Sequence, residues 1–294
     1  DVVIVGSGAG GGVTAEILTA AGLKVVIVEE GPLRTSSDFN MREAEAYPDL
    51  YQESAARKTA DKAINILQGR CVGGSTTVNW TSSFRTPQTT LNWWQRAHGL
   101  KRLSVEALAP WFAAMEQRLH VGLWPVPPNE NNAVLARGAA KLGIPTATIR
   151  RNVKLCWNLG YCGMGCPIDA KQSMLLTTIP AALTNGATLI SRLRAERLEF
   201  SGRQATLLTG AALKPDGLHP SGVKITLRAR HFVLAGGAIN SPALLMRSAA
   251  TDPHKLLGKR TFLHPTIISS GLFERPIRAY AGAPQSVYSD HFLD

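Results

Sequence analysis

The run DVVIVGSGAGGG at the start of the chain constrains the fold more than any other stretch. Residues Asp1–Val5 are almost all β-branched and apolar, which is typical of a strand buried on both faces of a parallel sheet. Residues Val13–Ala21 carry apolar side chains at helical spacing, and Lys24–Val28 forms a second β-branched run. The sequence therefore predicts a strand, a glycine-rich turn, a helix and a second, parallel strand.

The glycines of this turn have the spacing G-x-G-x-x-G. In that arrangement Gly6 permits a tight turn, Gly8 lets the backbone approach a pyrophosphate, and Gly11 lets the helix pack against the strand. The free N–H groups at the helix N-terminus then face the anion. Glu29 follows the second strand, where a carboxylate can accept hydrogen bonds from ribose hydroxyls, and strand alternation favours it over Glu30. We predict a dinucleotide site, and the alternative is a purely structural turn.

Two further blocks indicate which dinucleotide is bound. GRCVGGSTTVNWTSSFRTP spans residues 69–87, and AGGAINSPALL spans residues 235–245. Together with the first turn, they resemble the ordered motifs of the glucose-methanol-choline (GMC) oxidoreductases, flavoenzymes that oxidise alcohols. The resemblance implies an α/β chain with a Rossmann-like FAD-binding fold. Its expected parts are a parallel sheet with helices on both faces, an inserted irregular and helical region, and the start of an antiparallel substrate domain.

The resemblance also implies where FAD lies. The cofactor would run along both glycine turns, with Asn79 near the isoalloxazine ring and Ala195 near the adenine. Val78 stands where some relatives carry a histidine that tethers the flavin, so we expect FAD to be bound without a covalent link. Trp80 stands where smaller residues are often found, which changes the expected shape of the pocket beside the ring. The expected cofactor-binding residues are Gly6, Gly8, Gly11, Glu29, Arg70, Gly73, Gly74, Ser75, Asn79, Ala195, Ala235 and Gly236.

The activity implied by the resemblance is hydride transfer from an alcohol carbon to flavin N5. No residue matches the family's distal segment with its catalytic histidine, so we expect no catalytic residue in this chain and a fragment that is inactive alone. The expected division is an FAD-binding domain over 1–260, with insertions at about 32–65 and 88–185, and the beginning of a substrate domain over 261–294. An NAD-dependent dehydrogenase and a non-catalytic dinucleotide-binding module are the alternatives. The alcohol and the electron acceptor, whether oxygen, a quinone or a redox protein, stay open.

The formal net charge of +11 raises the question of nucleic acid or an anionic membrane surface as a partner. Lys and Arg are spread along the chain without a recognition motif, so we expect a solvated surface and no nucleic-acid partner. No apolar run approaches the roughly twenty residues of a membrane span, so we expect no transmembrane segment in this chain. Whether the protein is cytoplasmic or periplasmic stays open.

The middle of the chain predicts further elements. Residues 32–61 read as an irregular excursion from the sheet. We expect Ser104 to cap a short helix, Pro110 to start the next one over 111–120, and Asn240 to cap a helix over 241–247. The remaining expected elements are a loop at 121–132, a helix at 133–141, a strand at 187–190, and strands at 222–228 and 231–234 that rejoin the cofactor sheet.

A cysteine-rich loop follows, with Cys156, Cys162 and Cys166 in the spacing C-x5-C-x3-C. Three thiolates could bind zinc or an iron–sulfur cluster if a fourth ligand came from elsewhere, but the spacing matches neither common pattern. We therefore expect no metal and interpret the segment as a structural loop. In an exported protein, Cys162 and Cys166 could instead form a disulfide.

Overall fold

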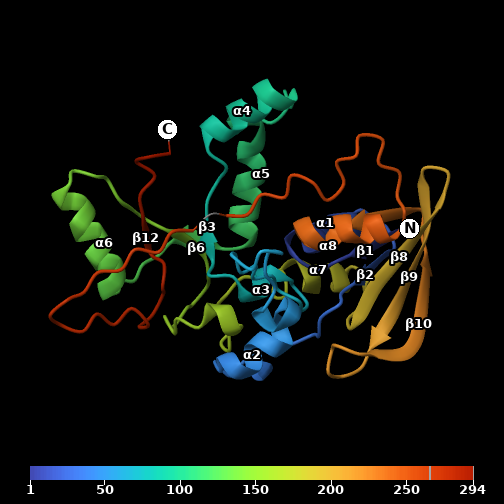
Figure 1. Cartoon of the computed structure of the whole chain (residues 1–294), viewed down its shortest axis with the longest axis horizontal. Helices are drawn as coiled ribbons and strands as arrows, with labels where there is room; N and C mark the ends of the chain where they lie inside the picture. The colour runs from blue at the N-terminus through green and yellow to red at the C-terminus, as the bar shows by residue number, and fades with distance from the viewer. Residues whose placement is uncertain (265, 294) are drawn as a thin grey trace. The chain divides into compact units, whose positions relative to one another are not determined.

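The computed structural model describes residues 1–264 and 266–293 (Figure 1). The chain forms two compact units. The first unit comprises Asp1–Val78, Met164–Pro167 and Ser173–Ser270, and the second comprises Asn79–Gly163, Ile168–Gln172 and Gly271–Asp294. The expected boundary at 260 and the expected substrate domain at 261–294 remain predictions, and Pro265 and Asp294 of that stretch lie outside the described residues.

A parallel sheet is the centre of the first unit. Its strands run in the order β11 (His231–Leu234), β1 (Val2–Val5), β2 (Val25–Val28) and β7 (Thr188–Ile190), and every neighbouring pair is parallel. The chain passes from β1 to β2 through helix α1 (Ala9–Ala20), as the glycine turn and the two β-branched runs predict. This confirms the Rossmann-like arrangement expected from the sequence.

Different layers cover the two faces of this sheet. Helix α1 packs against α7 (Thr178–Thr184) on one face, where a Cβ atom added at Gly11 would approach Ile4 Cγ2 at 3.3 Å. The opposite face carries Val3, which packs in a core cluster with Leu208 and Leu244. Leu244 comes from helix α8 (Gly237–Arg247), and Leu208 from a second sheet. Helices therefore lie on both faces, and on one face an antiparallel sheet joins them.

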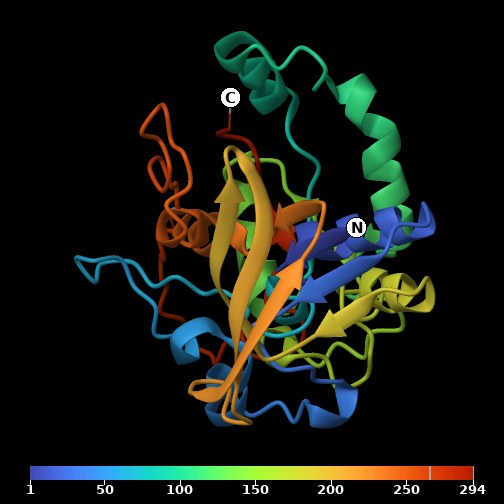
Figure 2. The ribbon, with the colours of Figure 1, turned by 90° about the vertical axis from the view of Figure 1, so that its right-hand side faces the viewer.

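The antiparallel sheet has the order β10 (Pro220–Arg228), β9 (Gln204–Leu213) and β8 (Leu193–Ser201), and its strands stand in front in Figure 2. The sequence did not predict β8 and β9, because their alternation of apolar and polar residues is interrupted at two irregularities in the register. The expectation that 222–228 rejoins the cofactor sheet is wrong. That segment pairs with β9, and only β11 returns beside β1.

The second unit combines three helices with short antiparallel strands. The helices are α4 (Gln88–His98), α5 (Val105–Arg118) and α6 (Glu130–Lys141). The strands β3 (Ser82–Ser83), β6 (Arg150–Asn152) and β4 (Val121–Leu123) form one sheet, and β5 (Ala147–Thr148) pairs with β12 (Val287–Tyr288). The other elements of the chain are α2 (Glu43–Leu50), α3 (Ser75–Val78) and the single-turn 3₁₀ helices η1 (Ser36–Asp38), η2 (Gln52–Ala55) and η3 (Cys162–Met164).

Several predicted helix boundaries are wrong. Ser104 does cap a helix, since its hydroxyl accepts a hydrogen bond from Ala107 N at 3.1 Å, but Pro110 lies inside that helix and does not begin another. Pro110 lacks the N–H that would donate to the carbonyl of Glu106 four residues earlier, but α5 continues through it. Asn240 likewise lies inside α8, which begins at Gly237. Residues 121–132 hold β4 and the start of α6, so they are not one continuous loop.

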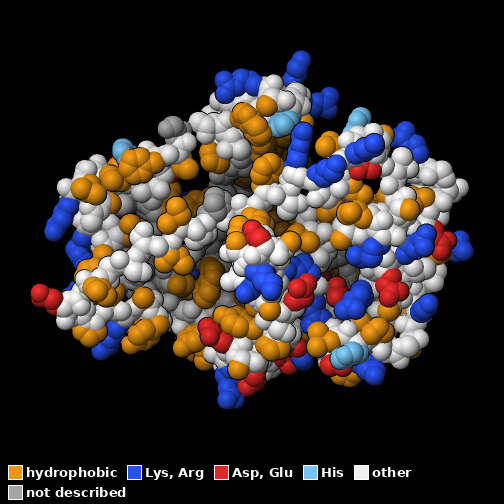
Figure 3. Space-filling view, viewed as in Figure 1, with side chains coloured by type: hydrophobic (Ala, Val, Ile, Leu, Met, Phe, Trp, Pro, Cys, Tyr) orange, Lys and Arg blue, Asp and Glu red, His pale blue; other side chains and the backbone are white. Residues whose placement is uncertain are grey.

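Two expectations concern the surface: the absence of a transmembrane segment and a solvated distribution of Lys and Arg. No helix of the described chain is long and apolar enough to span a bilayer. On the face shown in Figure 3, Lys and Arg side chains are scattered among acidic and apolar ones, and they do not form one continuous patch. That distribution agrees with a solvated basic surface.

Candidate dinucleotide site

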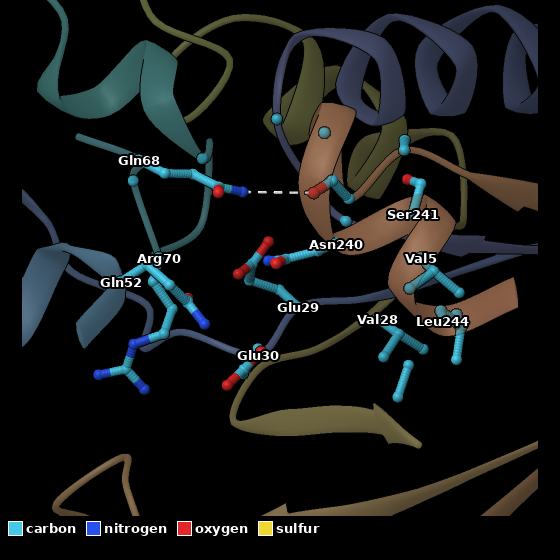
Figure 4. Close-up of a pocket in the computed structure, with 18 of the residues that line it drawn as sticks. Val5, Val28, Glu29, Glu30, Gln52, Gln68, Arg70, Asn240, Ser241 and Leu244 are labelled. Carbon is cyan, nitrogen blue, oxygen red and sulfur yellow. Dashed lines mark hydrogen bonds between the residues drawn. The ribbon is translucent and has the colours of Figure 1, made fainter. Parts of the chain in front are cut away.

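A cavity of about 890 Å³ opens at the carboxyl ends of β1, β2 and β11 in the first unit (Figure 4). Ligands of open α/β sheets bind at this edge, where the loops after the strands meet. The chain segments that line the cavity lie far apart in the sequence. They are the turn from β1 into α1, the end of β2, residues between 52 and 76, the start of β8, and the turn from β11 into α8.

The first glycine turn forms one wall of the cavity, and its three motif glycines differ in role. Gly6 has φ +100°, and a Cβ atom there would lie 2.5 Å from the carbonyl oxygen of Ala235. A Cβ atom at Gly11 would lie 1.9 Å from the oxygen of Gly6, so α1 can approach β1 only with glycine at this position. Gly8 lines the cavity, and a Cβ atom there would meet only Gly74 Cα, at 3.8 Å. Open space therefore adjoins Gly8 and not Gly11.

The second glycine turn lies against the first. A Cβ atom at Gly74, which has φ +53°, would lie 2.8 Å from Gly8 Cα. Gly74 and Ser75 line the cavity, and the Ser75 hydroxyl accepts a hydrogen bond from Gly69 N at 2.9 Å. Gly73 does not line the cavity, and its N–H donates to the Ser7 hydroxyl at 3.0 Å. The two motifs therefore form one continuous backbone cradle.

Glu29 holds this cradle together. Its side chain is buried, with one carboxylate oxygen accepting from the Ser7 N–H (3.0 Å) and the Ser7 hydroxyl (2.7 Å). The other oxygen accepts from the N–H of Gly31 at 2.9 Å. Burial raises the pKa of Glu29, although these hydrogen bonds oppose the rise. Because Ser7 also accepts from Gly73, Glu29 links both glycine turns to the end of β2.

Strand alternation did not separate the two glutamates. Both Glu29 and Glu30 line the cavity, so the choice of Glu29 as the ribose ligand stays a prediction. Strand β2 ends at Val28, and the alternation of faces ends with it. The Glu30 carboxylate accepts from Arg194 Nε at 3.0 Å, an ion pair that the sequence did not predict.

Four arginines line the cavity, and two of them lack an acidic partner. Arg57 pairs with Glu53 and Arg194 pairs with Glu30. Within the described residues, no carboxylate lies within 4.0 Å of the charged nitrogens of Arg70 or Arg247. Arg70 is only 5% exposed and donates to the carbonyl of Gly217. Two unpaired guanidinium groups beside one cavity favour an anionic ligand.

The remaining expected residues divide between the two units. Ala195, Ala235 and Gly236 line the cavity, and Gly236 O accepts from Gln68 Nε2 at 3.3 Å, the dashed line in Figure 4. Asn79 belongs to the second unit, where its carbonyl accepts from Lys171 Nζ at 2.7 Å. The sequence did not single out Ser7, Arg57, Gln68, Arg194 or Arg247. Of these, only the hydroxyl of Ser7 within the glycine turn offered a signal.

The cavity fits a dinucleotide such as FAD. Gly8 leaves room for a pyrophosphate beside the N-terminus of α1, a 12-residue helix with no acidic residue in its first turn. Arg70 and Arg247 supply positive charge, and Glu30 offers a carboxylate at the rim. The apolar side chains of Val5, Val28 and Leu244 line the same cavity and suit a flat ring system.

The cysteines form no disulfide in the described chain. The Cys162 thiol lies 3.5 Å from Arg151 Nη2, and the buried Cys71 thiol contacts the carbonyl of Gly74 at 3.7 Å. Within residues 1–264 and 266–293, no group of three or more His, Cys, Asp or Glu side chains is placed to hold a metal ion. Metal content therefore stays a prediction to be measured.

Comparison with known proteins agrees with this geometry. A GMC-type oxidoreductase of Sinorhizobium fredii, described as uncharacterised, is 30% identical over 95% of this chain and 54% of its own length. A long-chain-alcohol oxidase of Arabidopsis thaliana is 31% identical over 96% of this chain and 38% of its own length. The chain thus spans about half or less of these relatives.

A solved structure supports the fold. A fungal aryl-alcohol oxidase superposes with a TM-score of 0.61 at 18% identity, over 84% of this chain and 47% of that one. The family model described as GMC oxidoreductase matches residues 47–266, which include the second glycine turn and the turn from β11 into α8. With the cavity that these motifs line, this match shows that the chain belongs to the GMC oxidoreductase family and represents its N-terminal portion.

Proposed function

We propose that this chain binds FAD without a covalent link and forms the cofactor-binding part of an oxidoreductase that acts on the CH–OH group of an alcohol. The observation that carries the proposal is the joint cradle of Gly8 and Gly74 beside a cavity with two unpaired arginines. Family membership supports FAD as the dinucleotide. Bound FAD would supply the redox chemistry, taking up a hydride at N5 from the alcohol carbon.

In this proposal the residues of the chain bind and orient the cofactor. The backbone of the two glycine turns and the N-terminus of α1 would hold the pyrophosphate, and Glu29 would fix both turns. Val78 carries no nucleophile, which supports a non-covalent link. The proposed cofactor-binding residues are Gly6, Gly8, Gly11, Glu29, Arg70, Gly73, Gly74, Ser75, Asn79, Ala195, Ala235 and Gly236.

The substrate class is an alcohol. Support comes from relatives that are long-chain-alcohol oxidases and from a structural neighbour that is an aryl-alcohol oxidase. We assign no catalytic residue to this chain, because no histidine lines the cavity in the part of the chain that the structure describes. We propose that the base which accepts the hydroxyl proton comes from sequence corresponding to the other half of the relatives.

The test is anaerobic reduction of the full-length gene product by alcohols of different classes: a long-chain primary alcohol, an aryl alcohol, choline and a sugar. The protein should be yellow and should bleach with at least one of them. A colourless protein that binds NAD would favour a nicotinamide-dependent dehydrogenase instead. A yellow protein that no alcohol reduces would favour a cofactor-binding module.

The 294-residue chain is the matched comparison for the same assay. Supplied with FAD, it should not be reduced by the alcohol that bleaches the full-length product. Reduction at a similar rate would show that the base lies within the chain. His98, His120, His231 and His264 would then be the first positions to replace.

A further inference from the structure

The tip of the β9–β10 hairpin, residues 214–219, lies beside the cavity although none of its residues belongs to a family motif. Hydrogen bonds within the tip stabilise its turn. Asp216 accepts hydrogen bonds from the N–H groups of Leu218 (2.8 Å) and His219 (3.0 Å), and Lys214 N donates to His219 O at 2.8 Å. The hydrogen bonds from His219 and Leu218 hold the pKa of Asp216 well below its ordinary range. In this turn, the backbone carbonyls of Gly217 and Leu218 each accept a hydrogen bond from an arginine.

One carbonyl of the tip holds Arg70. The side chain of Arg70 donates from Nη1 to the carbonyl of Gly217, which is buried and has φ +69°. A Cβ atom at Gly217 would lie 3.3 Å from Arg70 Nη1 and 3.4 Å from Nη2, so the glycine packs directly on the guanidinium group. The guanidinium group of Arg70 has no other hydrogen-bond acceptor among the described residues. Its remaining N–H groups are available to a ligand in the cavity that Arg70 lines.

The neighbouring carbonyl holds Arg194. Arg194 donates from Nη2 to Leu218 O at 3.5 Å and from Nε to Glu30 at 3.0 Å. Arg194 precedes Ala195, the residue expected beside the adenine. The tip thus connects two cavity-lining arginines that come from separate segments of the chain, one from the second glycine turn and one from β8.

We propose that the β9–β10 tip is a clasp for the adenosine half of the cofactor. The carbonyls of Gly217 and Leu218 position Arg70 and Arg194 so that their free N–H groups donate to acceptor atoms of the adenosine phosphate. Arginine suits this task because its planar guanidinium group offers five donors in fixed directions and stays charged. This inference rests on the proposed function and adds to it the part of the molecule that retains the cofactor.

The test measures the rate of FAD release from the full-length gene product, followed by the rise in flavin fluorescence after dilution. Two variants weaken the clasp: Arg194→Ala removes one guanidinium group, and Gly217→Ala places a methyl group against Arg70. Each should speed FAD release at least about tenfold, the range expected for losing one charge-assisted hydrogen bond.

Each variant has a matched control in the same sheet. Arg197→Ala removes an equal charge from β8 at an exposed position that does not line the cavity. Gly202→Ala changes a turn glycine with φ +60°, close to the +69° of Gly217, but its Cβ atom would meet nothing within 4 Å. Both controls should release FAD at the wild-type rate. The thermal midpoint of the cofactor-free protein should be the same for each variant and its control.

FMN lacks the adenosine half of FAD, so its affinity distinguishes the loss of the clasp from a general loosening of the fold. Its affinity should be equal in the wild type and in both clasp variants. Unchanged FAD release from both clasp variants would overturn the inference, as would equal acceleration in their controls or an equal loss of FMN affinity. A wild-type protein that takes up no FAD would overturn the proposed function itself, and the inference with it.

Discussion

A substitution of Gly8 should impair pyrophosphate binding and leave the fold intact. The φ of Gly8 is −69°, which any residue adopts, and a Cβ atom there would meet only Gly74 Cα at 3.8 Å. We expect Gly8→Val to fold, because the added atoms extend into the cavity and not into packed backbone. The same atoms would occupy pyrophosphate space, so FAD content should fall at least about tenfold, measured by flavin absorbance per folded protein.

Gly138→Val is the control for Gly8→Val. Gly138 lies on helix α6, outside the cavity, and a Cβ atom there would meet nothing within 4 Å. This variant should keep full flavin content. Normal flavin content in a folded Gly8→Val protein would contradict the phosphate role.

Glu29 and Glu30 differ in their partners, and this difference predicts different effects on the cofactor. Glu29→Ala removes the acceptor of Ser7 and Gly31, which fixes both glycine turns. Glu30→Ala removes only an ion pair at the rim of the cavity. The dissociation constant for FAD should therefore rise more for Glu29→Ala, by about tenfold over Glu30→Ala, as titrated by flavin fluorescence. Equal losses would contradict the assignment.

At the residue scale, motif spacing predicted which glycines form the two turns, because glycine positions can be read directly from the sequence. Gly6, Gly8, Gly74 and Ser75 all line the cavity, and their contact with a cofactor stays a proposal. Spacing could not predict partners that depend on the folded chain. The contact of Arg70 with Gly217 joins residues 147 positions apart, and no local pattern marks it.

At the scale of elements, two glycines of α1 test different contributions to stability. Gly12 tests the packing of α1 against α7, and Gly10 tests the helix propensity of α1. A Cβ atom at Gly12 would lie 2.5 Å from Thr178 Oγ1 and 3.1 Å from Met174 Cβ, while one at Gly10 would meet only Ala235 Cβ at 3.8 Å. Gly12→Ala should lower the free energy of unfolding by about 1–3 kcal/mol through overpacking against α7. Gly10→Ala should raise it by up to about 1 kcal/mol, because alanine favours a helix.

Urea unfolding of the two variants, without added cofactor, checks this prediction. The order of the midpoints should be Gly12→Ala below the wild type and Gly10→Ala at or above it. A Gly12→Ala protein as stable as the wild type would show that α1 and α7 are not in the close contact described.

The cysteine-rich loop is the second element with a direct test. Cys156, Cys162 and Cys166 offer three sulfurs at a spacing unlike common metal sites, so we expect no stoichiometric metal. Elemental analysis of carefully prepared protein should find well under one zinc or iron per chain. About one zinc, or the iron and sulfide of a cluster, would contradict this expectation.

Elements with strong local patterns were predictable, and those that depend on tertiary pairing were not. The β-branched runs at β1 and β2 predicted buried parallel strands, and these are observed. The strand expected at 231–234 is observed as β11, beside β1. Strands β8 and β9 escaped prediction. In β8 the adjacent polar residues Glu196 and Arg197 break the alternation of apolar and polar residues, at an irregularity in the register with β9. These strands form because each pairs with a neighbour, and the sheet packs on Val3 and Val28.

At the scale of the whole molecule, three short motifs carry most of what the sequence predicts about function. Residues 6–12, 69–75 and 235–245 are far apart in the sequence, yet residues of all three line one cavity. The parallel sheet brings the first and the third together, because they follow its neighbouring strands β1 and β11. Family membership follows from them. The chain spans about half the length of the first curated relative it matches, so an alcohol substrate stays a proposal.

The most direct test of the central claim is the identity of the small molecule that the purified full-length gene product releases on heat denaturation. Chromatography of the supernatant should show FAD, at about one molecule per chain, with a colourless protein pellet. That result would agree with a dinucleotide cradle and with Val78 at the position where a tether would stand. NAD in place of FAD, or a pellet that keeps its flavin, would contradict the account.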